Sequence, residues 1–258
     1  MKIQNISEIK LREGKKIFFA SDIHLGLNTF EKSIEREKRF IKWLDKIKPE
    51  TQVLFLLGDV FDFWYEYKKV IPRGFSRFIG KLCEFTDSGI EVHLFTGNHD
   101  IWIYDYLPAE TGVILHRNHV TLNINSKKFF LGHGDGLSPH DKGYRFLKSI
   151  FTSKIMQFFF SRLHPNLAMA FGHKWSNHSR LSKGLSEGYL GDDKEHQVVF
   201  AKEYLKTSEV NYFIFGHRHY PMDLKLSETS HLINLGEWIH SNSFASFNGI
   251  EAKLEYFK

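Results

Sequence analysis

The chain has 258 residues, of which 42% are apolar and 25% are charged, so it can bury a substantial core as one large domain or as a domain with an insertion. The single cysteine, Cys83, excludes a disulfide framework within the chain and a thiolate metal cluster, and it indicates a reducing compartment. The formal net charge of +5 fits an anionic partner such as a phosphate ester, a nucleic acid or a membrane surface, or simply a solvated basic surface.

Neither a secretion signal nor a membrane-spanning helix is expected. Residues 1–16 lack the apolar stretch of a signal peptide. No run of 18 apolar residues occurs, so any contact with a membrane is expected at its surface.

Strands and amphipathic helices alternate in the first 95 residues. We predict strands over 15–20, 52–57 and 90–95, and helices over 31–48 and 75–89. This alternation predicts βαβ units and a parallel sheet.

The second part of the chain departs from this alternation. Strands are expected at 120–125, 128–132 and 210–215, and helices at 144–163, 166–184 and 194–206. We therefore predict an α/β core formed by residues 1–141 and 208–258, with residues 142–207 inserted as a helical cap, or lid.

Five polar clusters follow predicted strands. They are SDIHLG (21–26), LGDVFDFW (57–64), GNHD (97–100), GHGDG (132–136) and GHRH (216–219). The carboxyl ends of strands are where ligands bind in open α/β sheets, so these clusters can converge on one site.

Two carboxylates, one amide and four imidazoles stand out in these clusters. They are Asp22, His24, Asp59, Asn98, His133, His217 and His219. Nitrogen and oxygen donors suit Mn²⁺, Fe or Zn²⁺, and seven ligands fit two ions if one carboxylate bridges them. Taken alone, the tetrapeptide GNHD is more simply interpreted as a polar turn, and it is the presence of the four companion clusters that favours a metal site.

The order D-x-H, GD-x-x-D, GNHD, GH and GHxH resembles the calcineurin-like metallophosphoesterases over residues 16–135 and 210–240. The resemblance implies a four-layer α/β/β/α sandwich and two divalent metal ions. It assigns Asp22, His24, Asp59 and His219 to one ion and Asp59, Asn98, His133 and His217 to the other, with Asp59 as the bridge.

The resemblance also implies catalytic roles for Asp59, through the water that the two ions activate, and for His99, which would face the substrate. We expect Asp100 to hold the His99 ring in one tautomer. Asp62 could orient a metal ligand or merely cap a turn, and Asp135 has no assigned role. A surface or structural role is expected for the histidines outside the motifs, which are His93, His116, His119, His140, His164, His173, His178, His196, His231 and His240.

The predicted cap is rich in phenylalanine between residues 150 and 171, with Lys and Arg interleaved. This pattern suits an interfacial element on anionic lipid, or a pocket for acyl chains. The alternative is that these aromatic residues simply pack the cap against the core.

Three further blocks are similar to UDP-2,3-diacylglucosamine pyrophosphohydrolases: GD-x-F-x-x-W (58–64), HGDGL followed by DKGY (141–144), and LGEW (235–238). That family hydrolyses UDP-2,3-diacylglucosamine to UMP and the acylated sugar 1-phosphate, on the cytoplasmic face of the inner membrane during lipid A synthesis, usually with Mn²⁺. The similarity implies a protein at the inner face of the cell membrane, in contact with anionic lipid through the cap. Substrate contacts are then expected from Asn98, His99, Asp141, Ser176, Asn177, Arg180 and Lys183.

One departure from that family keeps other functions open, because its best-known branch has Arg where this chain has His99. The runner-up is a phosphatase or phosphodiesterase for nucleotides or another lipid phosphate. A non-catalytic scaffold of the same fold would have lost metal ligands, and all seven types are present here. A nuclease predicts a long basic groove, whereas the basic residues here are spread along the chain, so no nucleic acid partner is expected.

Overall fold

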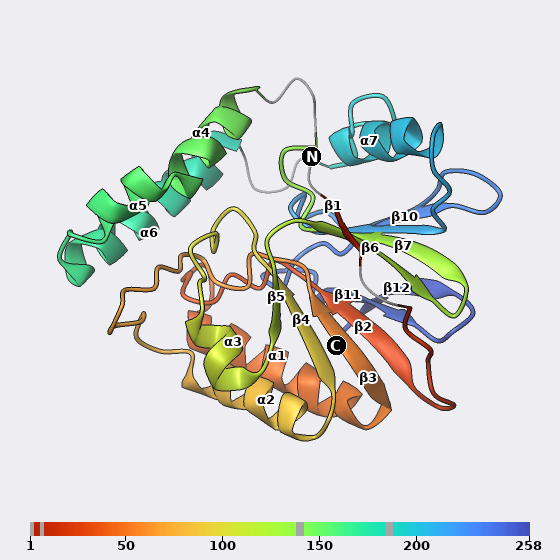
Figure 1. The fold of residues 1–258 in the computed structure, drawn as a ribbon, viewed down its shortest axis with the longest axis horizontal. Coiled ribbons are helices and arrows are strands. Elements are labelled where there is room, and N and C mark those ends of the chain that lie inside the picture. Colours follow the sequence, from red (N-terminus) through yellow and green to blue (C-terminus); the bar gives the residue numbers. More distant parts are fainter. Residues whose placement is uncertain (1–2, 6–7, 138–141, 184–187) are drawn as a thin grey trace.

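The computed structural model describes residues 3–5, 8–137, 142–183 and 188–258. Two six-stranded sheets stack face to face, and helices cover both outer faces (Figure 1). The strand orders are β12-β11-β2-β3-β4-β5 and β1-β6-β7-β8-β10-β9. The predicted four-layer α/β/β/α sandwich is therefore confirmed.

The first sheet is built from the predicted βαβ units. Its strands are β2 (Lys16–Ala20), β3 (Thr51–Leu56), β4 (Glu91–Phe95), β5 (Ile114–His116), β11 (Ser243–Phe247) and β12 (Ala252–Tyr256). The connecting helices are α1 (Ser33–Ile47), the short 3₁₀ helix η1 (Lys48–Glu50), α2 (Ser76–Asp87) and α3 (Tyr106–Thr111). Strands β2 to β5 pair in parallel, so their carboxyl ends lie along one edge.

The second sheet contains β1 (Ile3–Asn5), β6 (His119–Ile124), β7 (Lys127–Leu131), β8 (Tyr212–Phe215), β9 (Met222–Lys225) and β10 (His231–Asn234). Strands β7 and β8 pair in parallel although the whole helical insertion separates them in sequence. The polar clusters that follow these two strands are thereby brought side by side.

Aromatic side chains fill the space between the sheets. The ring of Phe19 stacks on Phe55 at 5.3 Å and on Phe129, from the other sheet, at 6.1 Å between centroids. Burying such large rings stabilises the stacked sheets, and it fixes the strand ends that carry the site.

Helix α7 (His196–Leu205) belongs to the sandwich and not to a cap. Its Val198 and Ala201 are fully buried in one cluster with Phe130 and Phe213 of the second sheet. The sequence placed this helix in the 142–207 insertion. Its apolar face instead covers the outer face of the sheet and supplies the fourth layer.

The helices α4 (Lys142–Thr152), α5 (Lys154–Phe160) and α6 (Pro165–Lys183) lie outside the four layers (Figure 1). They contact the core through Phe151 and Phe160, which pack against the aromatic cluster of Phe63, Tyr65 and Trp102. The Trp102 indole donates to the Phe151 carbonyl at 2.8 Å. Within the described part of the chain, no helix has the length and apolar character needed to cross a bilayer.

Candidate metal centre

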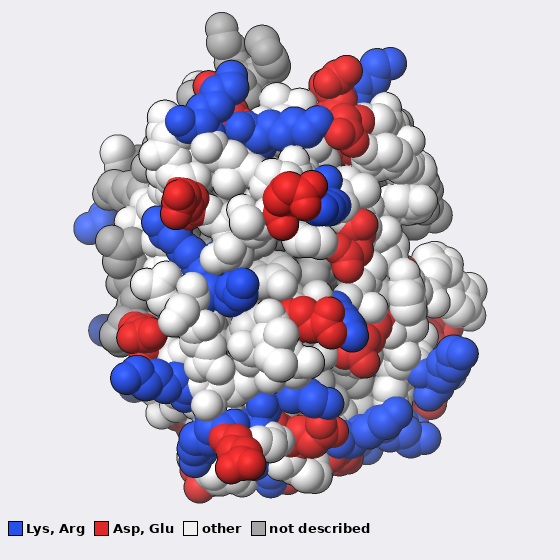
Figure 2. Space-filling model, turned by 90° about the vertical axis from the view of Figure 1, so that its right-hand side faces the viewer, with Lys and Arg blue, Asp and Glu red and all other residues white. Residues whose placement is uncertain are grey.

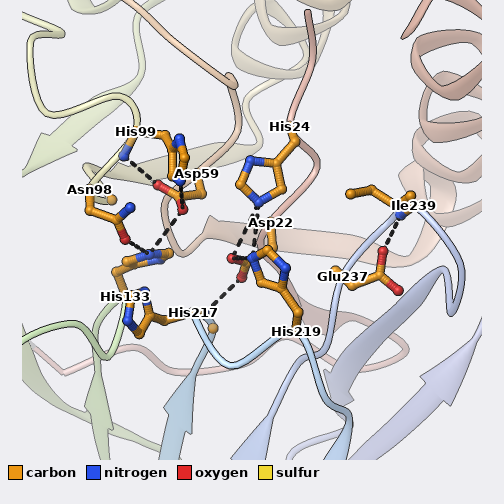
Figure 3. A network of polar contacts seen from close by, with 12 residues as sticks. Asp22, His24, Asp59, Asn98, His99, His133, His217, His219, Glu237 and Ile239 are labelled. Atoms are coloured by element: carbon orange, nitrogen blue, oxygen red, sulfur yellow. Dashed lines mark hydrogen bonds and ion pairs between the residues drawn. The ribbon is translucent and has the colours of Figure 1, made fainter. Parts of the chain in front are cut away.

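The structure brings one predicted ligand set to a single point, where Asp22, His24, Asp59 and His219 place a ligand atom each within 4.8 Å of one another (Figure 3). The Nε2 atoms of His24 and His219 face each other at 3.1 Å. His219 Nε2 also lies 3.1 Å from Asp22 Oδ1, a buried oxygen that accepts no hydrogen bond. Ligand atoms about 2.1 Å from one ion lie roughly 3 Å apart, so this spacing fits a cation between them.

The second predicted set gathers on the other side of Asp59. His133 Nε2 lies 3.4 Å from Asp59 Oδ2 and 3.2 Å from Asn98 Oδ1. The ring of His217 is 5.1 Å from that of His133 (Figure 3). Asp59 therefore contacts both sets, as a bridging carboxylate requires.

The ligand loops hold an unusual backbone conformation. Positive φ angles, from 49° to 71°, occur at Asp22, His24, Asp59, His217 and His219. Such conformations cost about 1–3 kcal/mol each and persist only where the surroundings impose them. Here the loops bond to one another: the amide of Asp22 donates to the Gly58 carbonyl at 3.0 Å, and that of His217 donates to Asp22 Oδ2 at 2.9 Å.

Two glycines are required because the carboxylates approach the backbone closely. A Cβ added at Gly97 would overlap the Asp59 carboxylate, and one at Gly216 would overlap the Asp22 carboxylate. The GNHD and GHRH clusters therefore begin with glycine because a ligand oxygen occupies the position of a side chain.

The buried charges favour a cation. Burial raises the pKa of Asp59, but positive charge on His133 and His99 outweighs burial and holds this pKa well below its usual range. Burial lowers the pKa of His133, whereas Asp59 raises it to about 10. For His217, burial and then the charge on His133 lower the pKa to about 3. Two fully buried carboxylates need compensating positive charge, and the donor set fits divalent metal ions.

His99 is oriented by the backbone of the preceding cluster. Its Nδ1–H donates to the Asp62 carbonyl at 3.0 Å and lies 3.1 Å from Ser176 Oγ. Its Nε2 lies 3.9 Å from Asp59 Oδ2 and so faces the metal centre (Figure 3).

Asp100 does not hold the His99 ring, contrary to the expectation from sequence. Its carboxylate accepts hydrogen bonds from the amides of Gly97, Val60 and Phe61 at 2.7, 2.8 and 3.3 Å. Burial, followed by the charge of Asp59, raises its pKa to about 7. Asp100 therefore ties the loop after β4 to the loop after β3.

Asp62 lies behind the metal ligands and not at an exposed turn. Its Oδ1 accepts from Ser176 Oγ at 2.8 Å and lies 3.9 Å from His24 Nδ1, while its Oδ2 lies 3.5 Å from His173 Nδ1. This favours the orienting role over the turn cap. A cluster of His24, Asp62 and His99 also satisfies the distances for a cation, but the backbone carbonyl of Asp62 already holds the His99 ring.

His173 is a site residue that the sequence motifs missed. It was assigned a surface or structural role, yet its ring packs against Phe63 and faces Asp62. The sequence feature that could have indicated this role is the position of His173 in the stretch 173–184, which was expected to contact the substrate.

Asp135 is also buried beside the centre. It accepts hydrogen bonds from the Tyr144 hydroxyl and, at 2.5 Å, from Lys148 Nζ. Burial raises the pKa of Asp135, but Lys148, His133 and His217 together hold it below its usual range.

The predicted substrate contacts are described only in part. Ser176 lies in the site, bonded to Asp62 and adjacent to His99. Asp141 and the side chains of Asn177, Arg180 and Lys183 lie outside the described residues.

The other described histidines include a structural pair. His93 Nδ1 lies 2.7 Å from His116 Nε2, and His93 Nε2 lies 2.6 Å from the Glu91 carboxylate, away from the centre.

A family model described as "Calcineurin-like phosphoesterase" matches residues 15–221. The chain therefore belongs to the calcineurin-like phosphoesterase family, and the expected metal-dependent phosphoesterase class is confirmed. Two relatives are named UDP-2,3-diacylglucosamine hydrolase. The relative from Porphyromonas gingivalis is 35% identical, and the alignment covers 93% of this chain and 97% of the relative. The relative from Haemophilus influenzae is 27% identical, and the alignment covers 87% of this chain and 91% of the relative.

Among solved structures, a dimetal phosphatase from Danio rerio is similar, with a TM-score of 0.44 and 14% identity, over 95% of this chain and 99% of its own. The phosphoesterase Yfce from E. coli has a TM-score of 0.43 and 14% identity, over 94% and 100%.

Proposed function

We propose that this enzyme hydrolyses the pyrophosphate of UDP-2,3-diacylglucosamine, releasing UMP and the diacylated sugar 1-phosphate. The observation that carries the proposal is a buried cluster of potential metal ligands that lies beside helices with exposed aromatic side chains. The names of the relatives supply the substrate class.

The seven predicted ligands would hold two divalent ions, with Mn²⁺ as the metal we expect. When bound, such ions neutralise phosphate charge and lower the pKa of water so that hydroxide is available near neutral pH. Asp59 lies between the two ligand sets and contacts both of them. Asp62 faces Nδ1 of His24 and orients this ring.

His99 is the proposed proton donor to the leaving oxygen. Because its Nδ1 proton points to the Asp62 carbonyl, Nε2 is the atom that faces the centre. The ring can donate from Nε2 only when both nitrogens carry a proton, and Nε2 lies 3.9 Å from the Asp59 carboxylate. His99 stands where the best-known branch has arginine, so both chains place a nitrogen donor at this position.

The cap helices are the proposed lipid contact. Phe151 and Phe160 pack against the core, but Phe146, Phe159 and Leu167 are 68%, 61% and 66% exposed. We expect acyl chains to lie along this apolar surface. Lys154 and Lys174 on the same helices, and Arg162 in the turn between α5 and α6, would contact anionic headgroups at the inner face of the cell membrane.

The proposed substrate contacts combine with this surface. Asn98, His99 and Ser176 line the centre next to α6. We propose that Asp141, Asn177, Arg180 and Lys183 complete the sugar phosphate site.

We expect no nucleic acid partner. On the face drawn in Figure 2, acidic and basic side chains are interspersed. A mixed surface of this kind gives little of the phosphate attraction on which nucleic acid binding depends.

Hydrolysis assays test the substrate. With Mn²⁺ present, UDP-2,3-diacylglucosamine should be converted to UMP and the acylated sugar phosphate far faster than aryl phosphates or cyclic nucleotides are hydrolysed. Turnover of those simple esters without turnover of UDP-2,3-diacylglucosamine would support the alternative phosphatase or phosphodiesterase instead.

A further inference from the structure

A cavity lies beside the candidate metal centre, next to α4 and α7. Its volume is about 690 Å³, which is within the usual range of small-molecule sites. It lies between α4, α7 and the chain segments that follow β4 and β5, so both the insertion and the core contribute walls.

This cavity borders the candidate metal centre. His133, a ligand of the proposed second ion, forms part of its wall, and Asp135 lines it two residues later. The ring of Tyr144, which also lines the cavity, lies 6.4 Å from that of His217. A phosphate held at the centre would therefore lie next to this cavity.

The walls combine flat apolar surface with polar groups. Phe95, Val199 and Phe200 supply apolar contacts, whereas Lys148 and Glu203 carry charge. His119 also lines the cavity, and its buried Nε2 has no hydrogen-bond partner among the residues that the structure describes. This composition suits a planar heterocycle with its own donors and acceptors, and it does not suit an alkyl chain.

We infer that this cavity binds the nucleoside half of the substrate, and hence the nucleoside monophosphate product. The inference rests on the proposed function and deepens it. The acyl chains would lie along the exposed side chains of α5 and α6, next to His99, and the uridine would lie beyond His133. The metal centre between them then meets the pyrophosphate that joins the two halves.

Titration of the Mn²⁺-loaded enzyme tests this inference, with UMP and inorganic phosphate as separate probes. Val199→Trp on α7 and Asn118→Trp in the turn after β5 fill the cavity from opposite walls, and both positions are exposed and tolerate a larger side chain. Lys202→Trp is the matched control, because it adds the same ring at an exposed position of α7 that does not line the cavity.

Wild type should bind UMP more tightly than phosphate. Both filling variants should weaken UMP binding about tenfold or more, which corresponds to about 1.4 kcal/mol, and should leave phosphate binding unchanged. The control should bind both probes as wild type does.

UMP affinity equal to that of phosphate in wild type, or unchanged in both filling variants, would overturn the inference. Failure of wild type to hydrolyse UDP-2,3-diacylglucosamine is a separate result. It would remove the proposed function, while the UMP titration would still decide whether the cavity binds a nucleotide.

Discussion

The metal centre and the α4–α6 helices are held to the protein in opposite ways. The candidate centre consists of short loops whose amides and carboxylates bond one another, and most of its proposed ligands are buried. The helices are attached by a few aromatic contacts and hydrogen bonds, and they expose much of their apolar surface. A rigid site suits ions whose ligands must be placed closely, whereas a loosely attached apolar surface can adapt to flexible chains.

The largest effect is expected from Asp59→Ala, because it removes the carboxylate shared by both ligand sets. Both ions should be lost and hydrolysis abolished, which elemental analysis of purified protein and a turnover assay can measure. Asp223→Ala, at a half-exposed carboxylate away from the centre, is the control and should keep both ions.

His99→Ala should lower kcat by about 10²–10⁴-fold, the usual contribution of a positioned acid or base. The metal content should stay at the wild-type level, because His99 belongs to neither proposed ligand set. Loss of metal in this variant would place His99 among the ligands and contradict the role assigned to it.

Gly97→Ala tests the rigid side of the comparison, since the added methyl group would displace Asp59. A displacement of about 1 Å can cost roughly 10²-fold in rate, and we expect a loss of that size. Gly80→Ala is the matched control because an added Cβ there meets no atom within 4 Å. Equal activities of the two variants would show that the close approach at Gly97 is unimportant.

Ser176→Ala tests how the helices reach the centre. Ser176 Oγ donates to Asp62, so its loss should loosen Asp62 and His99 and lower kcat about tenfold with metal content unchanged. Ser149→Ala removes an exposed hydroxyl from α4 and should have no effect. A change in KM with kcat unchanged would show that Ser176 acts through substrate binding alone and would contradict its role in positioning Asp62 and His99.

The smallest effect concerns stability against pH. Burial, followed by His93, lowers the pKa of His116 to about 4 in the folded protein, below the roughly 6.5 of an unfolded histidine. Above about pH 6.5 the ring is neutral in both the folded and the unfolded protein, and its full contribution to the free energy of unfolding is present. This contribution decreases as the pH falls below 6.5 and is lost as the pH passes through about 4. Urea unfolding from pH 7 to 5 should show a shallower decline for His116→Gln than for wild type; parallel declines would contradict this.

The four-layer order and the two ligand sets were implied by the resemblance to the calcineurin-like metallophosphoesterases. Local patterns predicted the individual strands and helices and the candidate ligands that follow strands, because the periods of strands and helices can be recognised within short segments. They did not place α7, because the partners of Val198 and Ala201 lie on a sheet far away in sequence. Asp100 was misassigned because its sequence neighbour is His99, whereas the turn directs its carboxylate toward backbone amides. His173 has no motif around it, and only the docking of α6 brings it to Asp62.

Anomalous diffraction at the manganese edge, from crystals grown with Mn²⁺, tests the central claim most directly. Two peaks are predicted, one among Asp22, His24, Asp59 and His219 and the other among Asp59, Asn98, His133 and His217. A single peak, or peaks that Asp59 does not touch, would contradict a dinuclear centre bridged by this carboxylate.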